Sequence, residues 1–384
     1  MEEGTYKENS NKELVNQYFK LQLDDFKQIK KLFEDFIFSF KNWNEIVIRL
    51  SDVLDKCDEI DYEENETAFA YAIWHFLDRY HRFQIIIADL WKRGYLRYKK
   101  NRSIDILEIG AGPAQGLFAF SEHYAELNKL YNKNIYSIQS DYVEQSNGFR
   151  NFLHHFVEYA MVNDKHYMIP FHFGRWKNAF DFKFEEFIYN WWGGFFKQKY
   201  RYDIVVISNF LTTQSYVEDF KKQLTDICKY VRNYGMLIVV GANDTSNKYK
   251  NIYSSVDAIV NRKFGNRNFW GWWNKVYEKT FSYNYSDEYG ELLREYYCTL
   301  MEFIIAKNLW DSVPKKARDK LIGTTKQTRE KTLAENWEGI HWKVVVYQKH
   351  SFYRRKNDRK ILNNKKQDAF GWMRRMKGDS DESR

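Results

Sequence analysis

The chain has little cysteine and little proline, with three residues of each among 384. Cys57, Cys228 and Cys298 are far apart and odd in number, which argues against a disulfide framework and against a cysteine-rich metal site. No apolar run is long enough for a membrane span, and the acidic start is typical neither of a signal peptide nor of a transit peptide. The composition therefore predicts a soluble, cytoplasmic protein with no membrane partner.

Aromatic residues are abundant, at 19% of the chain, and hydrophobic residues make up 44%. So many aromatic and hydrophobic side chains require a folded interior in which they can be buried. The net charge of +8 is uneven, because residues 353–384 carry eleven Lys and Arg against five Asp and Glu, which leaves about +2 for the rest. We expect a basic, disordered tail over 351–384 that could contact nucleic acid through charge alone.

Residues 1–100 have the pattern of a helical region. Apolar residues return at spacings of three and four over 13–40, as an amphipathic helix requires. A second long helix is expected over 64–94, with Asn65 or Thr67 as its N-cap and Gly94 at its end. This helical region is predicted to be a cap on the domain that follows or to lie on its substrate side.

From residue 103 the period changes, and short apolar runs alternate with helical stretches. Strands are expected over 103–109, 134–138, 168–174, 202–208, 235–241 and 341–352, with helices over 115–130, 143–162 and 217–233. Continuous apolar strands separated by helices are typical of a parallel sheet covered on both faces. We predict a doubly wound, mostly parallel α/β domain over 101–350, with a helical and aromatic insertion over 250–335.

The run ILEIGAGPAQG, residues 106–116, places a glycine-rich turn directly behind the first of these strands. Glycines at a strand-to-helix turn let the backbone approach a ligand, and free amides at the helix start favour electron-rich groups. A tight turn without a ligand is the simpler alternative. The turn lacks the Gly-Lys-Ser/Thr of a phosphate-binding loop, and Gln115 replaces the third glycine of a dinucleotide fingerprint.

With the acid Glu108 before it, L-E-I-G-A-G-P-A resembles the first motif of class I S-adenosylmethionine-dependent methyltransferases. The resemblance covers about residues 70–350 and implies a Rossmann-type fold with S-adenosyl-L-methionine as cofactor. It implies that Glu108 supports the methionine part of the cofactor. It also implies that the backbone of Gly110, Ala111, Gly112 and Pro113 approaches the cofactor closely, with Ala114 where a third glycine often stands.

In the same family, a residue at the end of the second strand accepts both ribose hydroxyls, which suits a carboxylate. Gln139 and Asp141 are the two alternatives for this position. The resemblance also places Asn209 and Phe210, at the end of the strand over 202–208, beside the methyl that is transferred. Asn209 is equally well explained as a strand-end turn residue. Arg175 and Trp176 are weaker candidates for adenine contact.

The residues also bear on the reaction. The run Ser208-Asn209-Phe210-Leu211 lacks the two prolines typical of enzymes that methylate exocyclic amines of bases, and no cysteine stands where cytosine C5 methylation needs a nucleophile. Weak catalytic candidates are His341 as a base and Asn209. Asn209, Asn243 and Asp244 could offer oxygens to Mg²⁺, but no carboxylate cluster accompanies them, so we predict no metal.

Three functions remain open at this stage. A methyltransferase acting on a small molecule is favoured slightly by the nearly neutral body of the chain. An RNA methyltransferase and a non-catalytic binding protein of the same fold are the alternatives. Two aromatic clusters, Trp191-Trp192 with Phe195-Phe196 and Trp270 with Trp272-Trp273, are predicted to fill the interior or to form a lid over the acceptor.

Overall fold

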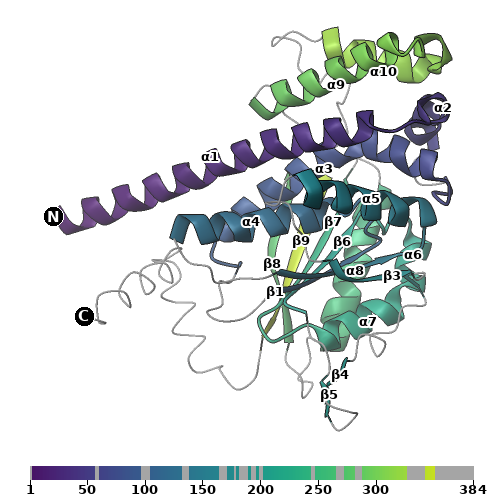
Figure 1. Ribbon diagram of the computed structural model, residues 1–384. Helices are drawn as coiled ribbons and strands as arrows, with labels where there is room; N and C mark the ends of the chain where they lie inside the picture. Colours follow the sequence, from purple (N-terminus) through teal and green to yellow (C-terminus); the bar gives the residue numbers. More distant parts are fainter. Residues whose placement is uncertain are drawn as a thin grey trace.

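The structure is a computed structural model that describes residues 2–56, 60–96, 104–131, 138–163, 171–176, 179–180, 189–191, 196–198, 202–243, 247–264, 272–281, 288–326 and 342–350. A central sheet is sandwiched between two layers of helices, and a further helical layer lies on top of one of them (Figure 1). The predicted tail over 351–384, together with Cys57, Asp244 and His341, lies outside the described residues. The predicted division of the chain at residues 100 and 350 stays a prediction.

The described strands form a seven-stranded sheet in the order β3-β2-β1-β6-β7-β9-β8. Its strands are β1 (Ile104–Ile109), β2 (Ile138–Glu144), β3 (Phe171–Trp176), β6 (Ile204–Ser208), β7 (Met236–Ala242), β8 (Trp272–Phe281) and β9 (Trp342–His350). The pairs from β3 to β7 are parallel, whereas β9 runs antiparallel to both of its neighbours. The predicted doubly wound, mostly parallel sheet is confirmed. A small antiparallel pair, β4 (Tyr189–Trp191) and β5 (Phe196–Gln198), stands apart from it.

Helices cover both faces of the sheet (Figure 1). One face carries α3 (Asn65–Lys92), α4 (Gln115–Tyr131) and α5 (Asn147–Asn163); the other carries α6 (Gln214–Asp219), α7 (Lys221–Tyr230) and α8 (Asn247–Phe264). Alternate residues of β1 face the two sides: Ile104 and Ile106 join the core under α3–α5, and Leu107 and Ile109 join the core under α6–α8. Burial on both faces explains why β1 is apolar almost throughout.

The outer helical layer lies over α3 and consists of α1 (Glu2–Phe38), α2 (Trp43–Lys56), α9 (Glu288–Ala306) and α10 (Lys315–Lys326), with a short 3₁₀ helix, η3 (Trp310–Ser312). Aromatic rings bind this layer to the one below. Phe33 of α1 stacks on Phe76 of α3 with ring centroids 4.8 Å apart, and Phe36 contacts Phe156 of α5 at 4.9 Å. The high aromatic content of the chain is therefore used largely in this interior.

Buried polar groups also hold α1 against α3 and α4. The Tyr18 hydroxyl lies 2.6 Å from Nδ1 of His123 of α4, and the Gln22 side chain donates to the Gln84 carbonyl of α3 at 3.2 Å. Asp25 faces Glu126 across the same interface, and burial raises the pKa of Asp25 to about 8, helped by the neighbouring carboxylate. The position of α1 is thus fixed by specific contacts as well as by apolar packing.

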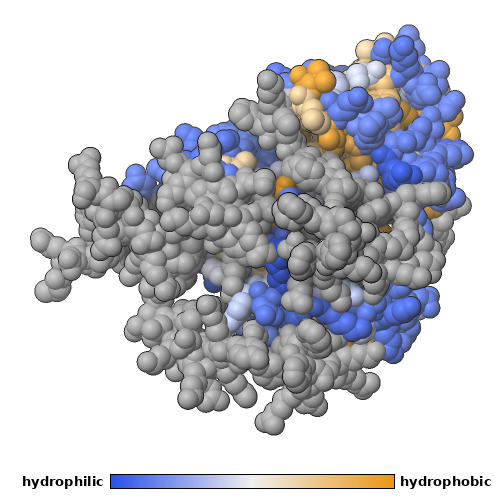
Figure 2. All heavy atoms as spheres, turned by 60° about the horizontal axis from the view of Figure 1, so that its bottom comes forward, coloured by the Kyte–Doolittle hydropathy of each residue, from blue (hydrophilic) through white to orange (hydrophobic). Residues whose placement is uncertain are grey.

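The described surface in Figure 2 is mainly hydrophilic, with an apolar group in the upper part of the view. Six large hydrophobic side chains are exposed among the described residues: Phe19, Ile48, Met161, Val162, Tyr216 and Ile305. They are dispersed over several helices, as is normal for single surface hydrophobics. Among the described helices, none combines the length and hydropathy that crossing a membrane requires.

Lys349 of β9 is only 3% exposed, and its ammonium caps the C-terminal end of α7. Its Nζ donates to the carbonyl oxygens of Cys228, Lys229 and Val231 at 2.9, 2.8 and 2.9 Å. Lys349→Met is expected to lower the free energy of unfolding by about 2 kcal/mol, because it leaves buried carbonyls without donors. Denaturant unfolding of this variant beside Lys221→Met tests the prediction. Lys221 makes an exposed ion pair, so its replacement should cost no more than about 0.5 kcal/mol.

Several sequence expectations need correction. The second strand was expected over 134–138, but the described strand is Ile138–Glu144, and α5 starts only at Asn147. The single helix expected over 217–233 is two helices that meet at Phe220. The strand β8 inside the predicted insertion was not expected. The strand expected over 103–109 is confirmed, since β1 spans Ile104–Ile109.

Candidate functional site

The carboxyl ends of β1, β2 and β6 meet at one edge of the sheet, directly beside the glycine turn. Ile109 at the end of β1 pairs with Val143 of β2 on one side and with Ile207 of β6 on the other. The Gly110 amide donates to the Val143 carbonyl at 2.9 Å, which ties the turn to the end of β2. A doubly wound sheet usually binds its ligand at this edge, where the chain leaves the first strand in one direction and its neighbour in the other.

The turn has left-handed backbone at three positions. Gly110, Gly112 and Ala114 have φ values of +63°, +52° and +56°. A Cβ on Gly110 would lie 2.8 Å from Cδ2 of Phe210, whereas one on Gly112 would meet nothing nearer than Phe149 at 3.9 Å. Gly110 thus allows close packing, and Gly112 leaves room for a ligand to approach. Ala114 pays a steric cost for its conformation, which indicates that the surrounding structure holds the turn in shape.

Glu144, the last residue of β2, reaches across to this turn. One carboxylate oxygen accepts the Gly112 amide at 2.8 Å, and the other accepts the Ser146 amide at 2.9 Å. The side chain belongs to a residue only 7% exposed, and burial raises its pKa, while the amide hydrogen bonds oppose the shift. Glu144 is therefore a preorganised acceptor group at the edge of the sheet, and sequence reasoning missed it.

Glu108 lies below the turn and is fully buried. Its Oε2 accepts the amide of Leu117 in the first turn of α4 at 3.2 Å, and Oε1 has no hydrogen-bond partner among the described residues. Burial raises the pKa of Glu108 to about 8; the Leu117 amide opposes the shift and the nearby Glu144 adds to it. The carboxyl is therefore mostly protonated at neutral pH.

The raised pKa of Glu108 also affects stability. The folded protein keeps a proton that the unfolded carboxyl loses above its ordinary pKa of 4.5. This group therefore lowers the free energy of unfolding as the pH rises from about 4.5 to about 8. Gly116 leaves the space that the carboxyl needs, because a Cβ there would lie 3.0 Å from Oε1 of Glu108 and 3.0 Å from Phe83.

Asn209 and Phe210 follow β6 and lie at the same edge, as the sequence predicted. Asn209 has a left-handed φ of +51°, its amide donates to the Val240 carbonyl at 2.8 Å, and its side chain donates to Ser208 Oγ at 3.0 Å. The Phe210 ring packs over Gly110 and contacts Phe220 at 5.2 Å. The structure therefore brings both residues to the glycine turn. A role for either in binding or catalysis stays a prediction.

Gln139 and Asp141 do not lie at this edge. Gln139 pairs with Asp105 near the amino end of β1, and Asp141 pairs with Leu107 in the middle of the strand. The Asp141 carboxylate accepts the Tyr202 hydroxyl at 2.6 Å and is buried. The premise that the second strand ends at either residue is wrong, because β2 continues to Glu144.

An aromatic wall closes one side of the edge. Segment 60–64, between α2 and α3, packs on the start of α5: the Gly148 amide donates to the Tyr62 carbonyl at 3.2 Å, and the Asn147 side chain donates to Glu63 at 2.7 Å. The Tyr62 ring contacts Phe149 with centroids 4.7 Å apart, and Phe149 is the side chain that a Cβ on Gly112 would meet first, at 3.9 Å. The helical N-terminal region thus contributes directly to the site.

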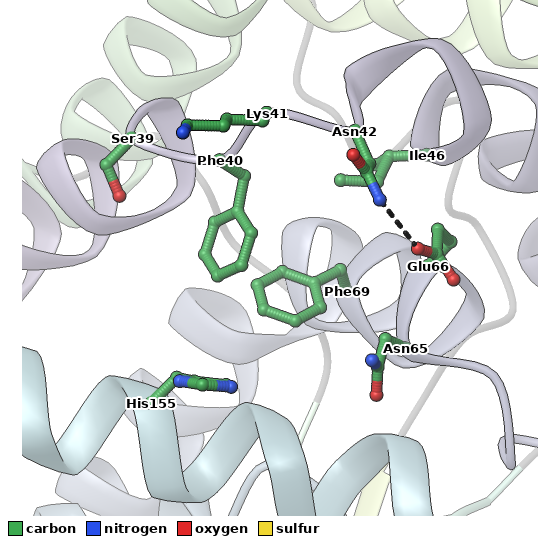
Figure 3. A pocket seen from close by; sticks show the side chains of 9 residues that line it. All are labelled: Ser39, Phe40, Lys41, Asn42, Ile46, Asn65, Glu66, Phe69 and His155. Atoms are coloured by element: carbon green, nitrogen blue, oxygen red, sulfur yellow. Dashed lines mark hydrogen bonds between the residues drawn. The ribbon is translucent and has the colours of Figure 1, made fainter.

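Two cavities lie farther out among the helices. The one in Figure 3, of about 300 Å³, lies between the α1–α2 turn, the start of α3 and the middle of α5; its lining includes Phe40, Phe69, Lys41 and His155. The Phe40 and Phe69 rings form its floor, with centroids 4.0 Å apart. The other, of about 320 Å³, borders segment 60–64 and the start of α3. Neither is lined by the glycine turn, so the site is defined by the backbone and carboxyl geometry described above.

The remaining candidates have different outcomes. His341 and Asp244 lie outside the described residues, and the described residues contain no group of three or more His, Cys, Asp or Glu side chains arranged for a metal ion. Arg175 and Trp176 pair with Val143 and Glu144, so their backbone is at the site edge.

Of the two interpretations of the aromatic clusters, interior packing is confirmed for Trp273, and the alternative of a lid does not fit the position of Trp272 and Trp273. They pair with His350 and Lys349, at the edge where β7 begins, opposite the glycine turn. Trp273 is 3% exposed and packs into the core beneath α6–α8. Trp192, Phe195 and Trp270 lie outside the described residues.

No protein-family model and no curated protein matches the chain. Among solved structures, phosphoethanolamine N-methyltransferase 2 of Haemonchus contortus, in complex with S-adenosyl-L-methionine, is 13% identical with a TM-score of 0.41; the alignment covers 79% of this chain and 60% of that one. A SAM-dependent methyltransferase from Geobacter sulfurreducens, in complex with S-adenosyl-L-homocysteine, is 10% identical with a TM-score of 0.39, covering 70% and 91%. The cyclopropane synthase MmaA2 from Mycobacterium tuberculosis is 8% identical with a TM-score of 0.41, covering 69% and 83%. These similarities are distant, and the function proposed below rests on the site.

Proposed function

We propose that the chain is an S-adenosyl-L-methionine-dependent methyltransferase that acts on a small-molecule acceptor. One observation carries the proposal: Glu108 below and Glu144 beside a left-handed glycine turn, all at the carboxyl edge of a doubly wound sheet. The sequence motif from Leu107 to Ala114 supports the same function. The glycine turn allows a ligand to approach the backbone closely. The two carboxyls can contact polar groups at the two ends of that ligand.

Glu144 fits the ribose of this cofactor. A carboxylate has about four lone-pair positions, and backbone amides of Gly112, Ser146 and Gln145 all bond to this one. The remaining acceptor capacity faces the glycine turn and would serve the hydroxyl donors of a diol. Because these amides already fix the carboxylate, little orientational freedom would be lost on binding.

Glu108 fits the methionine end. When bound, S-adenosyl-L-methionine supplies a methyl group activated by a sulfonium, and it also carries an ammonium group. A buried carboxyl with one unpartnered oxygen is suited to pair with such a cation, since ionisation and pairing would satisfy both groups. Phe210 and Asn209 at the adjacent strand end would then lie on the side of the methyl.

A small acceptor is favoured by the body of the chain, whose net charge is only about +2 once residues 353–384 are set apart. The aromatic wall of Tyr62 and Phe149 also narrows the site on the side of β2. Calorimetric titration of the full chain with S-adenosyl-L-methionine and S-adenosyl-L-homocysteine tests the proposal. Binding of both supports it, and absence of binding would overturn it in favour of a non-catalytic protein.

Binding of the cofactor at pH 7 is expected to release up to about one proton per site. Glu108, with a pKa of about 8, is mostly protonated in the free protein, and a cation beside it would lower that pKa. The release is measured as a difference in apparent binding enthalpy between phosphate and Tris buffers, whose ionisation enthalpies differ. Glu108→Gln, which carries no titratable proton, should remove the difference. Equal enthalpies in both buffers for the wild type would contradict the role given to Glu108.

A further inference from the structure

The cavity in Figure 3 has an aromatic floor and a polar rim. Its volume of about 300 Å³ lies at the lower end of the range for small-molecule sites. The planes of the Phe40 and Phe69 rings meet at 59°, and the buried side chain of Ile46 adds to the apolar lining. A ligand with one aromatic ring can pack on this pair in the offset or edge-to-face arrangements that rings prefer.

The floor is held in place by the core behind it. The Phe36 ring contacts both floor rings, with centroids 5.0 Å from Phe40 and 5.9 Å from Phe69. Hydrogen bonds close the turn that carries Phe40: its amide and the Trp43 side chain donate to the Ile37 carbonyl at 3.3 and 3.1 Å. The cavity is therefore formed before a ligand enters, and little conformational entropy is lost on binding.

The rim beside Phe40 carries two nitrogen donors. Figure 3 shows Lys41 and His155 on either side of the Phe40 ring, one from the α1–α2 turn and the other from the middle of α5. Both residues are exposed, and neither makes a hydrogen bond or an ion pair within the described part of the chain. An ammonium and an imidazole at one end of an apolar floor favour a carboxylate there, because its oxygens accept from both.

The rim beside Phe69 offers an acceptor. Glu66 lies in the first turn of α3, and its Oε1 accepts from the Asn42 side chain at 3.4 Å (Figure 3). Its Oε2 bonds to no other described residue. Next to it, the Asn65 side chain accepts from Asn151 of α5 at 2.9 Å, which joins α3 to α5 at the border of the cavity. A hydrogen-bond donor of a ligand is favoured at this end, and an anionic group is repelled.

The second cavity, of about 320 Å³, has the opposite charge. It is lined by Arg49 and by four acids, Asp52, Asp61, Glu63 and Glu64. Arg49 already pairs with Asp52 and Glu64. An anion is repelled from such a lining. Charge therefore distinguishes two cavities of similar volume, and only the one in Figure 3 suits a carboxylate.

We propose that the cavity in Figure 3 is a second ligand site, for a small monocyclic aromatic carboxylate with a hydroxyl group at the far end of its ring. The carboxylate accepts hydrogen bonds from Lys41 and His155, the ring packs on Phe40 and Phe69, and the hydroxyl donates to Glu66. The inference goes beyond the proposed function, because no residue of the glycine turn lines this cavity. It makes the α1–α2 turn, α3 and α5 parts of one binding site.

The test is a calorimetric titration of the full chain with 4-hydroxyphenylacetate, which carries all three groups. Saturable binding to one site is expected. Tyramine is the matched control ligand, because it has the same phenol but an ammonium in place of the carboxylate. It should bind at least about tenfold more weakly, since Lys41 repels the ammonium.

Variants of the rim locate the site. Lys41→Met is expected to weaken binding of 4-hydroxyphenylacetate about tenfold, because a charge-assisted hydrogen bond is lost. Lys41→Arg, which keeps the charge and the donors, should recover most of the affinity. Arg49→Met removes the same charge from the second cavity and should change the affinity by less than about twofold. Because Lys41 is exposed and has no partner among the described residues, its replacement should leave the fold intact.

Glu66→Met tests the other end of the site. The wild type should bind 4-hydroxyphenylacetate more tightly than phenylacetate, which lacks the hydroxyl. In Glu66→Met this preference should disappear, because the acceptor is gone. Binding of phenylacetate should be no weaker than in the wild type, since a negative charge has been removed from the rim.

Two results would overturn the inference. One is the absence of saturable binding, and the other is equal binding by the wild type and Lys41→Met, which would place the probe elsewhere on the chain. Both are distinguishable from failure of the proposed function, because Lys41→Met should bind S-adenosyl-L-homocysteine as tightly as the wild type does. If the wild type does not bind S-adenosyl-L-homocysteine, the proposed function fails, and the same titration with 4-hydroxyphenylacetate still tests the cavity.

Discussion

Glu144→Ala is expected to weaken S-adenosyl-L-homocysteine binding about 100-fold. The carboxylate would lose two hydrogen bonds to the ribose diol, and each bond to a charged group contributes about 1.5 kcal/mol or more. The variant also frees the Gly112 amide, so the turn itself loses an anchor. Calorimetric titration beside the wild type measures the effect, with thermal unfolding to verify that the fold persists.

Gln139→Ala is the matched control for Glu144→Ala, because it lies on the same strand five residues earlier and away from the edge. It should change the affinity by less than about threefold, within the range of ordinary surface substitutions. Glu144→Gln should fall between the two, since an amide keeps one acceptor oxygen. The opposite ranking, with Gln139→Ala the damaging change, would refute the ribose role of Glu144.

Gly148→Ala is expected to lower the free energy of unfolding by about 3 kcal/mol. An added Cβ would lie 2.4 Å from the Tyr62 carbonyl oxygen and 2.5 Å from that of Glu64, and both obstacles are backbone. To relieve this clash, segment 60–64 must move away from the start of α5. This movement also breaks the hydrogen bond from the Gly148 amide to the Tyr62 carbonyl. Denaturant unfolding followed by circular dichroism measures the loss.

Gly323→Ala is the counterpart, since nothing lies within 4 Å of its added Cβ and the residue is inside α10. It should stabilise the protein by about 0.5 to 1 kcal/mol through helix propensity. Equal free energies of unfolding for the two variants would contradict the prediction. They would show that segment 60–64, and the aromatic wall with it, can shift away from α5 at little cost in free energy. Cofactor affinity measured on Gly148→Ala reports how far the wall matters for binding.

The first strand and the glycine turn were predictable because their signals are local. An apolar run that ends in two glycines and a proline, followed by a helical pattern, has few other interpretations. The end of β2 was missed because polar residues, Asp141 and Glu144 among them, interrupt its apolar pattern. A helix-start signal was present: Ser146 Oγ accepts the Phe149 amide at 3.3 Å as an N-cap. Placing the helix start there would have extended the strand to Glu144.

Other parts of the site could not be predicted from short patterns. Tyr62 reaches Phe149 across 87 positions of the chain, and no spacing rule connects them. Lys41 and His155 are far apart in the sequence, and the cavity that they share is visible only when its surroundings are known. Such contacts depend on how helices pack, whereas propensity and periodicity describe single elements.

The place of β9 in the sheet governs how the protein can fold during synthesis. In the described sheet, β8 pairs with β9 alone, and β9 lies between β8 and β7 although it follows both in the chain. While residues 342–350 are still inside the ribosome, β7 has an open edge and β8 has no strand to join. The sheet therefore completes late, through contacts between β7 and β9 that are about a hundred residues apart in sequence, and nascent chains stalled before residue 342 would expose the edge of β7 to aggregation.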